Sequence, residues 1–302
     1  MVQGMGQRPH HMVLTDQPGK GAGSEFAREY LITHDRRYCS GFPGLEVANA
    51  ATRPGIRPQE IHLTTVSAFD RSPLVIGHRG AAGLLPENTL PSFSKALDLG
   101  VQAVELDVHA CEGELVVIHD DTLERTTNGR GQVSTSTLSS LRALDAGGGA
   151  VIPTLAEVFE LVPPDVGINI ELKGAGTAEL LAAWLPRNPR HNVLLSSFEH
   201  QMLKTFAGLR NDYPLAPLFG RWQPDAITTA RAFGSGYINL GRKLVTPGRM
   251  SEITDAGLRA LVYTVNDPEE ARRFVRLGVW GVFTDYPDRI TRDGLSLPAG
   301  AA

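Results

Sequence analysis

The stretch Ala103-Val104-Glu105-Leu106-Asp107-Val108 places two carboxylates in an otherwise apolar run. Side chains alternate between the two faces of a strand, so Glu105 and Asp107 share one face. Packing does not require two acids at the end of a strand, whereas a metal-assisted hydrolytic site does. The stretch therefore predicts a core strand whose end carries chemistry.

On either side of this run, from Leu74 onward, short apolar runs alternate with helical patterns. The runs predict strands at 74–77, 102–108, 167–172, 192–198, 214–219, 236–240, 259–265 and 281–285. The intervening segments predict helices near 89–99, 154–162, 177–185, 200–209, 224–233, 247–256 and 267–277. This alternation is typical of βαβ units and a parallel sheet, and eight strands favour an α/β fold of the (β/α)8 TIM barrel type.

An open doubly wound sheet is the alternative fold. The glycine-rich dinucleotide fingerprint of that fold is missing after the first strand, where the sequence reads Gly77-His78-Arg79-Gly80. The stretch 109–153 is too long for a simple βα loop, which predicts a small insertion after the second strand. We therefore expect residues 71–302 to form the barrel.

Residues 1–70 lack sustained periodicity, and we expect an N-terminal extension that is partly disordered or caps the barrel. The formal net charge of −4 excludes a strong basic field, so no nucleic-acid partner is expected. Two cysteines among 302 residues are no disulfide framework, and no run approaches the roughly 20 apolar residues of a membrane span. These features predict a cytoplasmic protein without a transmembrane segment, and they carry no signal for its oligomeric state.

Further acids follow neighbouring strands. Glu171 ends the strand Gly167–Leu172, and Glu87 lies on the loop after the first strand. With Glu105 and Asp107 they form a set of four oxygen ligands, which suits Mg²⁺ or Ca²⁺ better than Zn²⁺. The alternative is that the acids form salt bridges with nearby basic residues inside the barrel.

Two histidines also stand at strand ends. His78 follows the first strand and His119 follows the apolar run 115–118. Imidazole titrates near neutral pH, so one ring can take a proton while the other gives one. We interpret His109 as a loop residue, because we expect the strand to end before it. Arg79 and Lys173 place positive charge beside the acids, which fits an anionic substrate such as a phosphate.

Several spaced motifs agree with one known family. They are Val75-Ile76-Gly77-His78-Arg79-Gly80, Pro86-Glu87-Asn88-Thr89, Glu105-Leu106-Asp107-Val108, Val117-Ile118-His119-Asp120, Ile152-Pro153-Thr154-Leu155, Glu171-Leu172-Lys173, Tyr263-Thr264-Val265-Asn266 and Phe283-Thr284-Asp285-Tyr286-Pro287. In this order, over roughly residues 74–290, the chain resembles the glycerophosphodiester phosphodiesterases. The resemblance implies a TIM barrel with a small insertion and a metal-dependent phosphoric diester hydrolase.

The resemblance also implies a role for each motif residue. Glu87, Glu105, Asp107 and Glu171 would hold the divalent cation, and His78 and His119 would be the general base and general acid. Arg79 and Lys173 would bind phosphate, and Tyr263, where many members carry Trp, would face the substrate. The implied reaction converts a glycerophosphodiester to glycerol 3-phosphate and an alcohol, by attack of a glycerol hydroxyl on phosphorus and opening of the resulting cyclic phosphate by water.

Two other functions compete with this one. A lysophospholipase D-like relative acting on lipid substrates would need an apolar groove or patch at the barrel mouth. A non-catalytic barrel that binds phosphodiesters is expected to lack a histidine or a metal acid, and here all are present.

Overall fold

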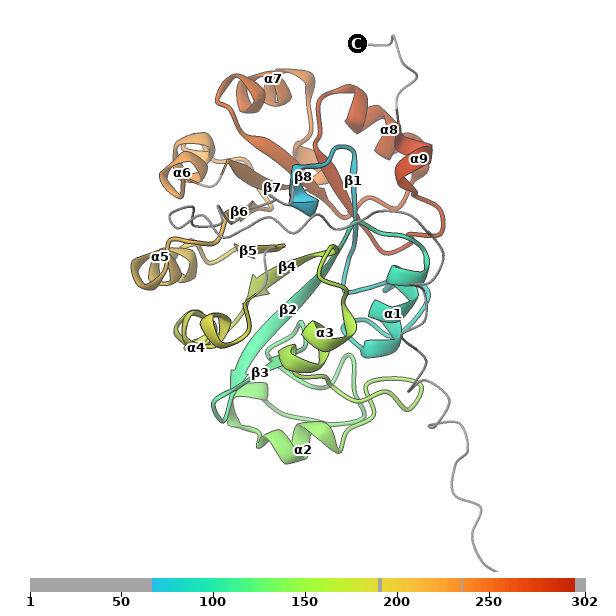
Figure 1. Ribbon diagram of the computed structural model, residues 1–302, viewed down its shortest axis with the longest axis vertical. Helices are drawn as coiled ribbons and strands as arrows, with labels where there is room; N and C mark the ends of the chain where they lie inside the picture. Colours follow the sequence, from blue (N-terminus) through green and yellow to red (C-terminus); the bar gives the residue numbers. More distant parts are fainter. Residues whose placement is uncertain (1–66, 190–191, 235, 297–302) are drawn as a thin grey trace, which may run out of the picture. The chain divides into compact units, whose positions relative to one another are not determined.

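The computed structural model describes residues 67–189, 192–234 and 236–296, in which eight parallel strands close into a ring (Figure 1). The ring closes because β1 pairs with both β2 and β9. The strands are β1 (Leu74–Gly77), β2 (Ala103–Cys111), β4 (Gly167–Leu172), β5 (Val193–Ser197), β6 (Leu215–Phe219), β7 (Tyr237–Gly241), β8 (Arg259–Tyr263) and β9 (Gly281–Thr284). The predicted (β/α)8 barrel is therefore confirmed.

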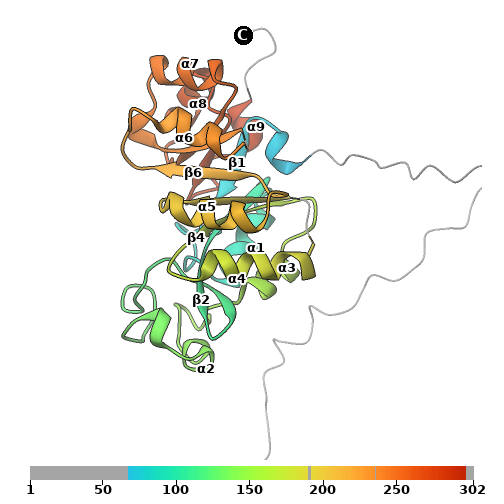
Figure 2. The ribbon, with the colours of Figure 1, turned by 90° about the vertical axis from the view of Figure 1, so that its left-hand side faces the viewer.

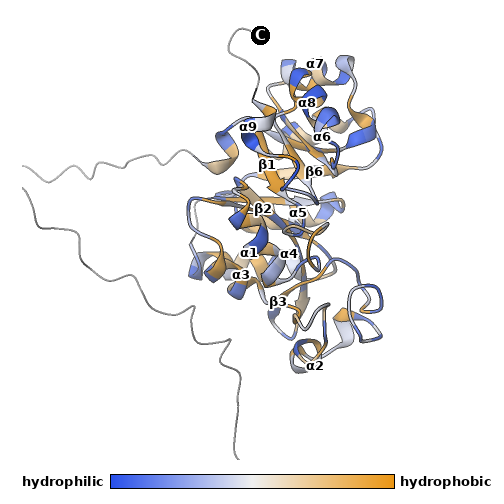
Figure 3. Ribbon diagram, turned by 90° about the vertical axis from the view of Figure 1, so that its right-hand side faces the viewer, coloured by the Kyte–Doolittle hydropathy of each residue, from blue (hydrophilic) through white to orange (hydrophobic). Residues whose placement is uncertain are grey.

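Helices cover the outside of the ring, and Figure 2 shows α4 to α7 following one another along one side. Within the described part of the chain they are α1 (Leu90–Asp98), α3 (Leu155–Leu161), α4 (Thr177–Trp184), α5 (His200–Leu209), α6 (Ala226–Ala232), α7 (Pro247–Asp255) and α8 (Pro268–Arg276), followed by α9 (Arg292–Leu295). In Figure 3 the strands are mostly coloured as hydrophobic, and the hydrophilic colour is found mainly on the outer helices. The main core therefore lies between strands and helices, as expected for this architecture.

The first helix begins as its sequence predicts. The Thr89 side chain accepts a hydrogen bond from the Ser92 backbone N–H, and Pro91 lies in the first turn. Gly100, with φ of +77°, follows the C-cap in the left-handed region that glycine favours. These local signals fix the length of the loop between β1 and α1, which carries several site residues.

The long connection after β2 forms a small lobe of its own. Its strand β3 (Glu114–Val117) pairs antiparallel with the end of β2, and its helix α2 (Leu138–Arg142) covers a separate apolar cluster. Since β3 supplies hydrogen-bonding partners for residues 108–111, β2 continues past the point where its pairing with β4 ends. Our interpretation of His109 as a loop residue is therefore wrong, because His109 is a buried residue of β2.

Apolar side chains fill the interior of the ring near the amino-terminal ends of the strands. Leu74, Ile76 and Leu261 belong to this inner cluster, and Phe69 from the short turn Ala68–Asp70 packs with them. Phe69 also lies against Gly167, where a Cβ atom would come within 2.8 Å of the ring. The barrel core therefore includes residues before position 71, while the expectations for residues 1–66 lie outside the described residues.

Within the described residues, no helix combines the length and the apolar character needed to cross a bilayer.

Candidate active site

Three acids meet at the carboxyl ends of two adjacent strands. In the parallel pair β2–β4, Asp107 is in register with Glu171, and Glu105 lies two residues earlier on the same face of β2. One carboxylate oxygen from each of Glu105, Asp107 and Glu171 lies within 4.8 Å of the other two, and all three residues are buried. We call these three residues the acidic cluster.

The electrostatics of the acidic cluster favour a bound cation. Burial, together with the charges of the neighbouring acids, raises the pKa of Glu105, and burial and Asp107 raise the pKa of Glu171 to about 7. Burial acts in the same direction on Asp107, but Lys173 and Arg79 outweigh it and lower the pKa of that carboxyl. Asp107 Oδ1 accepts no hydrogen bond from the described residues. Three buried carboxylates that converge on one point fit a hard divalent cation such as Mg²⁺ or Ca²⁺.

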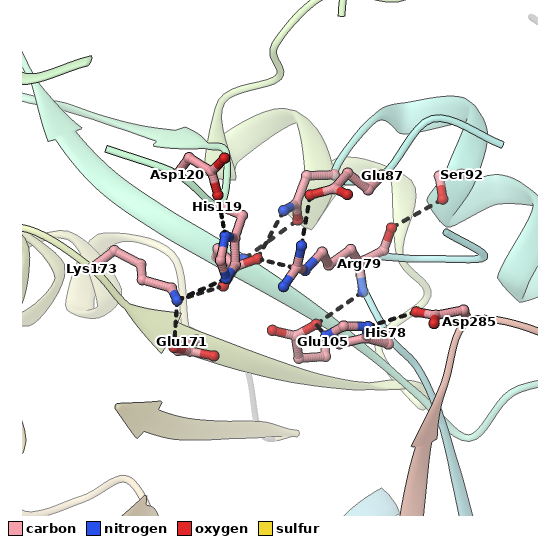
Figure 4. Close-up of polar contacts among 12 residues, drawn as sticks. His78, Arg79, Glu87, Ser92, Glu105, His119, Asp120, Glu171, Lys173 and Asp285 are labelled. Atoms are coloured by element: carbon pink, nitrogen blue, oxygen red, sulfur yellow. Dashed lines mark hydrogen bonds and ion pairs between the residues drawn. The ribbon is translucent and has the colours of Figure 1, made fainter. Parts of the chain in front are cut away.

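Two basic side chains border the acidic cluster (Figure 4). Lys173 Nζ lies 2.7 Å from Glu171 Oε1 and 3.4 Å from Asp107 Oδ1. The Arg79 backbone N–H donates to Glu105 Oε2 at 2.9 Å, and Arg79 Nε lies 3.3 Å from Asp107 Oδ2. Both predicted phosphate-binding residues therefore lie beside the acids. These contacts are also expected from the alternative interpretation, in which the acids form salt bridges with nearby basic residues.

The structure does not bring Glu87 into the acidic cluster. Its carboxylate accepts hydrogen bonds from Arg79 Nη1 at 2.7 Å and from Arg125 Nη1 at 2.8 Å. Although burial opposes the shift, these guanidinium groups lower the pKa of Glu87. In this arrangement Glu87 orients Arg79, and Asn88 binds the acidic cluster directly by donating to Asp107 Oδ2 at 2.9 Å.

The two predicted catalytic histidines have similar surroundings. His78 Nδ1 lies 2.7 Å from Asp285 Oδ1, and His119 Nδ1 lies 2.5 Å from Asp120 Oδ1 (Figure 4). An ionised carboxylate only accepts, so Nδ1 carries the hydrogen in both pairs and Nε2 is left for proton transfer. His78 Nε2 lies 4.0 Å from Glu105 Oε2. His119 Nε2 lies 3.2 Å from Lys173 Nζ.

The partners of the histidines are held in turn by other residues. Asn266 Nδ2 donates to Asp285 Oδ2 at 2.7 Å, and Arg125 Nε donates to Asp120 Oδ2 at 2.6 Å. The hydrogen bonds from Arg125 and His119 outweigh burial and lower the pKa of Asp120. Burial lowers the pKa of His119 itself.

Sequence reasoning assigned no role to Asp120, Asp285, Asn266 or Arg125. Three of them stand inside the quoted motifs, so a signal was present: Asp120 directly follows His119, and Asp285 and Asn266 belong to the closing segments. Arg125 lies in the insertion, outside every motif, and no sequence pattern marks it.

A cavity of about 210 Å³ opens between these groups and the far side of the barrel. Its charged side includes His78, Glu105 and His119, and its other side includes Phe198 and Tyr263, whose rings make an edge-to-face contact at 5.6 Å. The Tyr263 hydroxyl is buried without a hydrogen-bond partner among the residues described. Tyr263 therefore lines the same cavity as both histidines.

The family comparison agrees with this geometry. The model of the glycerophosphoryl diester phosphodiesterase family matches residues 78–289, which is more than half of the chain. The chain therefore belongs to the glycerophosphoryl diester phosphodiesterase family, a family of phosphoric diester hydrolases. The resemblance seen in the motifs is confirmed.

Individual relatives give the same result. A glycerophosphodiester phosphodiesterase of Caldanaerobacter subterraneus subsp. tengcongensis is 35% identical over 237 residues, covering 72% of this chain and 96% of that protein. The structure of a phosphodiesterase from Oleispira antarctica, in complex with the product sn-glycerol-3-phosphate, is similar with a TM-score of 0.71 and 30% identity. That match covers 74% of this chain and 98% of the other.

Proposed function

We propose that this protein hydrolyses glycerophosphodiesters to glycerol 3-phosphate and an alcohol. The observation that carries the proposal is the placement of two imidazoles, each held through Nδ1 by a carboxylate, beside the acidic cluster. The family membership and the product named in the Oleispira antarctica complex support the choice of glycerol as the alcohol that keeps the phosphate.

The acidic cluster is the proposed site of the divalent cation, Mg²⁺ or Ca²⁺. When bound, the cation supplies positive charge that neutralises both the buried carboxylates and the phosphate oxygens. Arg79 and Lys173 add two more positive charges at the same edge, so a phosphodiester anion is attracted to this side of the cavity. Glu87, predicted as a fourth ligand of the cation, contacts Arg79 rather than the acidic cluster, and we propose that it positions Arg79.

Proton transfer is assigned to the histidines. His78 takes the proton of the glycerol hydroxyl as that oxygen attacks phosphorus, and the bond from phosphorus to the leaving alcohol breaks. His119, protonated at Nε2, gives that proton to the departing oxygen while Asp120 holds its Nδ1–H. Water then opens the cyclic phosphate with the two roles reversed.

The substrate's own hydroxyl is the proposed nucleophile, because no serine or cysteine of the described residues is hydrogen-bonded to His78 or His119. Ser196 lines the cavity, but its hydroxyl accepts a hydrogen bond from Asn169 Nδ2 at 2.9 Å. An intramolecular attack also gains effective molarity.

A lysophospholipase D-like activity on lipids is the second candidate. Four of the large exposed hydrophobic residues described follow strand ends or lie in the insertion: Leu84, Leu85, Val151 and Phe198. Phe198, 47% exposed, stands at the cavity itself and offers an apolar surface to an acyl chain. A non-catalytic phosphodiester-binding barrel is disfavoured, because all the motif acids and histidines are present.

A substrate panel tests the proposal. The protein is incubated with glycerophosphocholine, glycerophosphoethanolamine or a lysophospholipid, each with Mg²⁺, Ca²⁺ or EDTA, and phosphorus NMR identifies the products. We expect glycerol 3-phosphate from the first two substrates with a divalent cation. Exclusive turnover of the lysophospholipid would favour the second candidate, and no turnover of any diester would refute both.

A further inference from the structure

The far side of the cavity contains buried polar groups that the fold leaves unpaired. Neither the amide nitrogen nor the amide oxygen of Asn239 has a hydrogen-bond partner in the described part of the chain, although the residue is fully buried. The side-chain oxygen of Asn169 is also unpaired, and that residue is 1% exposed. Both residues line the cavity that holds the histidines.

The neighbours of Asn239 explain why it finds no partner. On β7 it is in register with Leu218 of β6 and with Leu261 of β8, so apolar side chains flank it on both sides. A buried amide left without partners is costly and rare, and packing alone would favour a third leucine at this position. The amide is therefore best explained by a ligand group that enters the cavity.

Asn239 and Asn169 lie deeper in the barrel than Glu171 and the residues that follow the strand ends. Asn169 precedes Glu171 by two residues on the same face of β4 and is in register with Glu105. Asn239 precedes Gly241, the register partner of Tyr263, by two residues. In the ring order of the strands β7 stands opposite β2, so the unpaired amide lies across the cavity from the acidic cluster.

The fixed orientation of Asn169 complements this arrangement. Its Nδ2 donates to Ser196 Oγ at 2.9 Å, which leaves its oxygen as an acceptor. Asn239 offers both a donor and an acceptor. The ligand group that satisfies such a set is a hydroxyl, which donates and accepts at once. Neither a phosphate, which lacks a donor when ionised, nor a trimethylammonium group, which lacks an N–H, matches it.

We propose that Asn239, with Asn169, binds the terminal hydroxyl of the glycerol moiety and thereby selects glycerol diesters over diesters of shorter diols. This inference rests on the proposed function, since it assigns the deep side of the cavity to the glycerol half of that substrate. The hydroxyl that attacks phosphorus stays near the histidines, and the terminal hydroxyl reaches the deeper layer.

Binding measurements test the inference without turnover. Calorimetry with Mg²⁺ present compares sn-glycerol 3-phosphate with 2-hydroxyethyl phosphate, which keeps one hydroxyl and lacks the terminal hydroxymethyl group. We expect the unsubstituted protein to prefer the first ligand by roughly 10- to 100-fold, because the second leaves the amide unpaired. In Asn239→Leu the ratio of the two affinities falls to near one, with binding of 2-hydroxyethyl phosphate retained.

Two further variants keep the test decisive. Asn239→Ala removes the amide without adding bulk, and it replaces the leucine variant if that one fails to fold. Asn188→Ala, which removes an amide that donates to the Trp184 carbonyl outside the cavity, is the matched control and keeps the full preference. Equal affinities in the unsubstituted protein, or an unchanged ratio in both Asn239 variants, would overturn the inference and leave the deep layer to water.

A separate assay distinguishes this inference from the proposed function. Hydrolysis of glycerophosphocholine by the unsubstituted protein is followed alongside the binding series. If the unsubstituted protein hydrolyses glycerophosphocholine but the affinity ratio is unchanged in the Asn239 variants, the inference is refuted and the proposed function is supported. If the affinity ratios are as expected but no hydrolysis is detected, the glycerol site is supported and the proposed function is refuted.

Discussion

The two halves of the barrel mouth differ in kind. The half built by β1, β2 and β4 with the β3 lobe carries acidic and basic side chains, and we call it the charged half. These side chains include His78, Arg79, Glu105, His119 and Glu171. From β5 to β8, the described residues that line the same cavity include no acidic or basic side chain.

This difference separates two tasks. Acids, bases and a cation site suit the breaking of a phosphate ester, and they depend little on which alcohol is attached. Uncharged amides and aromatic rings suit recognition of shape and of hydroxyl groups. Changes in the charged half should therefore lower turnover for every substrate, whereas changes in the uncharged half should alter which substrate is preferred.

Removal of the cation is expected to have the largest effect. Chelation with EDTA, or Glu105→Gln, should lower kcat for glycerophosphocholine by about 10³-fold or more, since Lewis-acid stabilisation supplies several kcal/mol. Steady-state kinetics and metal-binding calorimetry check this prediction. The unfolding temperature of Glu105→Gln should stay close to that of the unsubstituted protein, and full activity in EDTA would contradict the cation site.

Loss of either histidine should come next. His78→Ala and His119→Ala should each lower kcat by about 10²- to 10⁴-fold, the usual range for a general acid or base. His200→Gln, which alters a histidine of α5 that is bonded to the Leu218 carbonyl, is the matched control. Near-normal turnover in both active-site variants would make the two rings structural residues.

The raised pKa of Glu171, about 7, predicts a pH-dependent cation affinity. Binding displaces a proton below that pH, so the affinity should rise by about tenfold per unit from pH 5 to pH 7. Without metal the sign reverses: a raised folded-state pKa means that the free energy of unfolding falls as pH rises from about 4.3 through 7.

Calorimetry and thermal unfolding across this pH range measure both effects. Glu171→Gln removes the titrating group and should flatten the dependence of stability on pH. A metal-free protein that becomes more stable from pH 5 to pH 7 would show that the acids are not strained by one another's charge.

The carboxylates behind the histidines should have a smaller effect. Asp285→Asn removes the acceptor that fixes the His78 ring, so we expect kcat to fall by about 10- to 100-fold while KM changes little. The pH profile of kcat should also shift, because the ring that takes the proton loses the carboxylate that holds its Nδ1–H. A loss of thermal stability with an unchanged pH profile would indicate a structural role alone.

The uncharged half should give the smallest change in turnover. Tyr263→Phe removes a hydroxyl that has no hydrogen-bond partner among the described residues, so we expect less than about a tenfold change in kcat. The ratio of kcat/KM for glycerophosphocholine and glycerophosphoethanolamine should change more than either kcat. Equal losses of about 10³-fold for both substrates would place Tyr263 in the chemistry and break the division between the halves.

The sequence predicts the strands of the barrel well, because each buried strand is an apolar run bounded by turn residues. It fails at His109, since β2 is prolonged by pairing with β3, an interaction between segments that the local pattern does not contain. The acids and histidines are predictable because a polar residue ending an apolar run stands out. Their convergence follows from the parallel register of β2 and β4.

Other site residues could not be found in this way. Arg125 reaches Glu87 and Asp120 from the insertion, and its role depends on how that lobe folds back. Asn239 resembles any polar residue in a strand until its unpaired amide is seen inside the cavity. We predict that deletion of about the first 60 residues leaves a folded, active enzyme, and these residues lie outside the described part of the chain.

The central claim is that the charged half moves protons while the substrate brings its own nucleophile. Parallel turnover measurements on glycerophosphocholine and bis(4-nitrophenyl) phosphate test it most directly, because the second diester has no hydroxyl beside the phosphate. We predict that the second diester turns over at least about 10³-fold more slowly, although its leaving group is better, because intramolecular attack is lost. Comparable turnover of the two diesters would contradict the claim and favour direct attack by water.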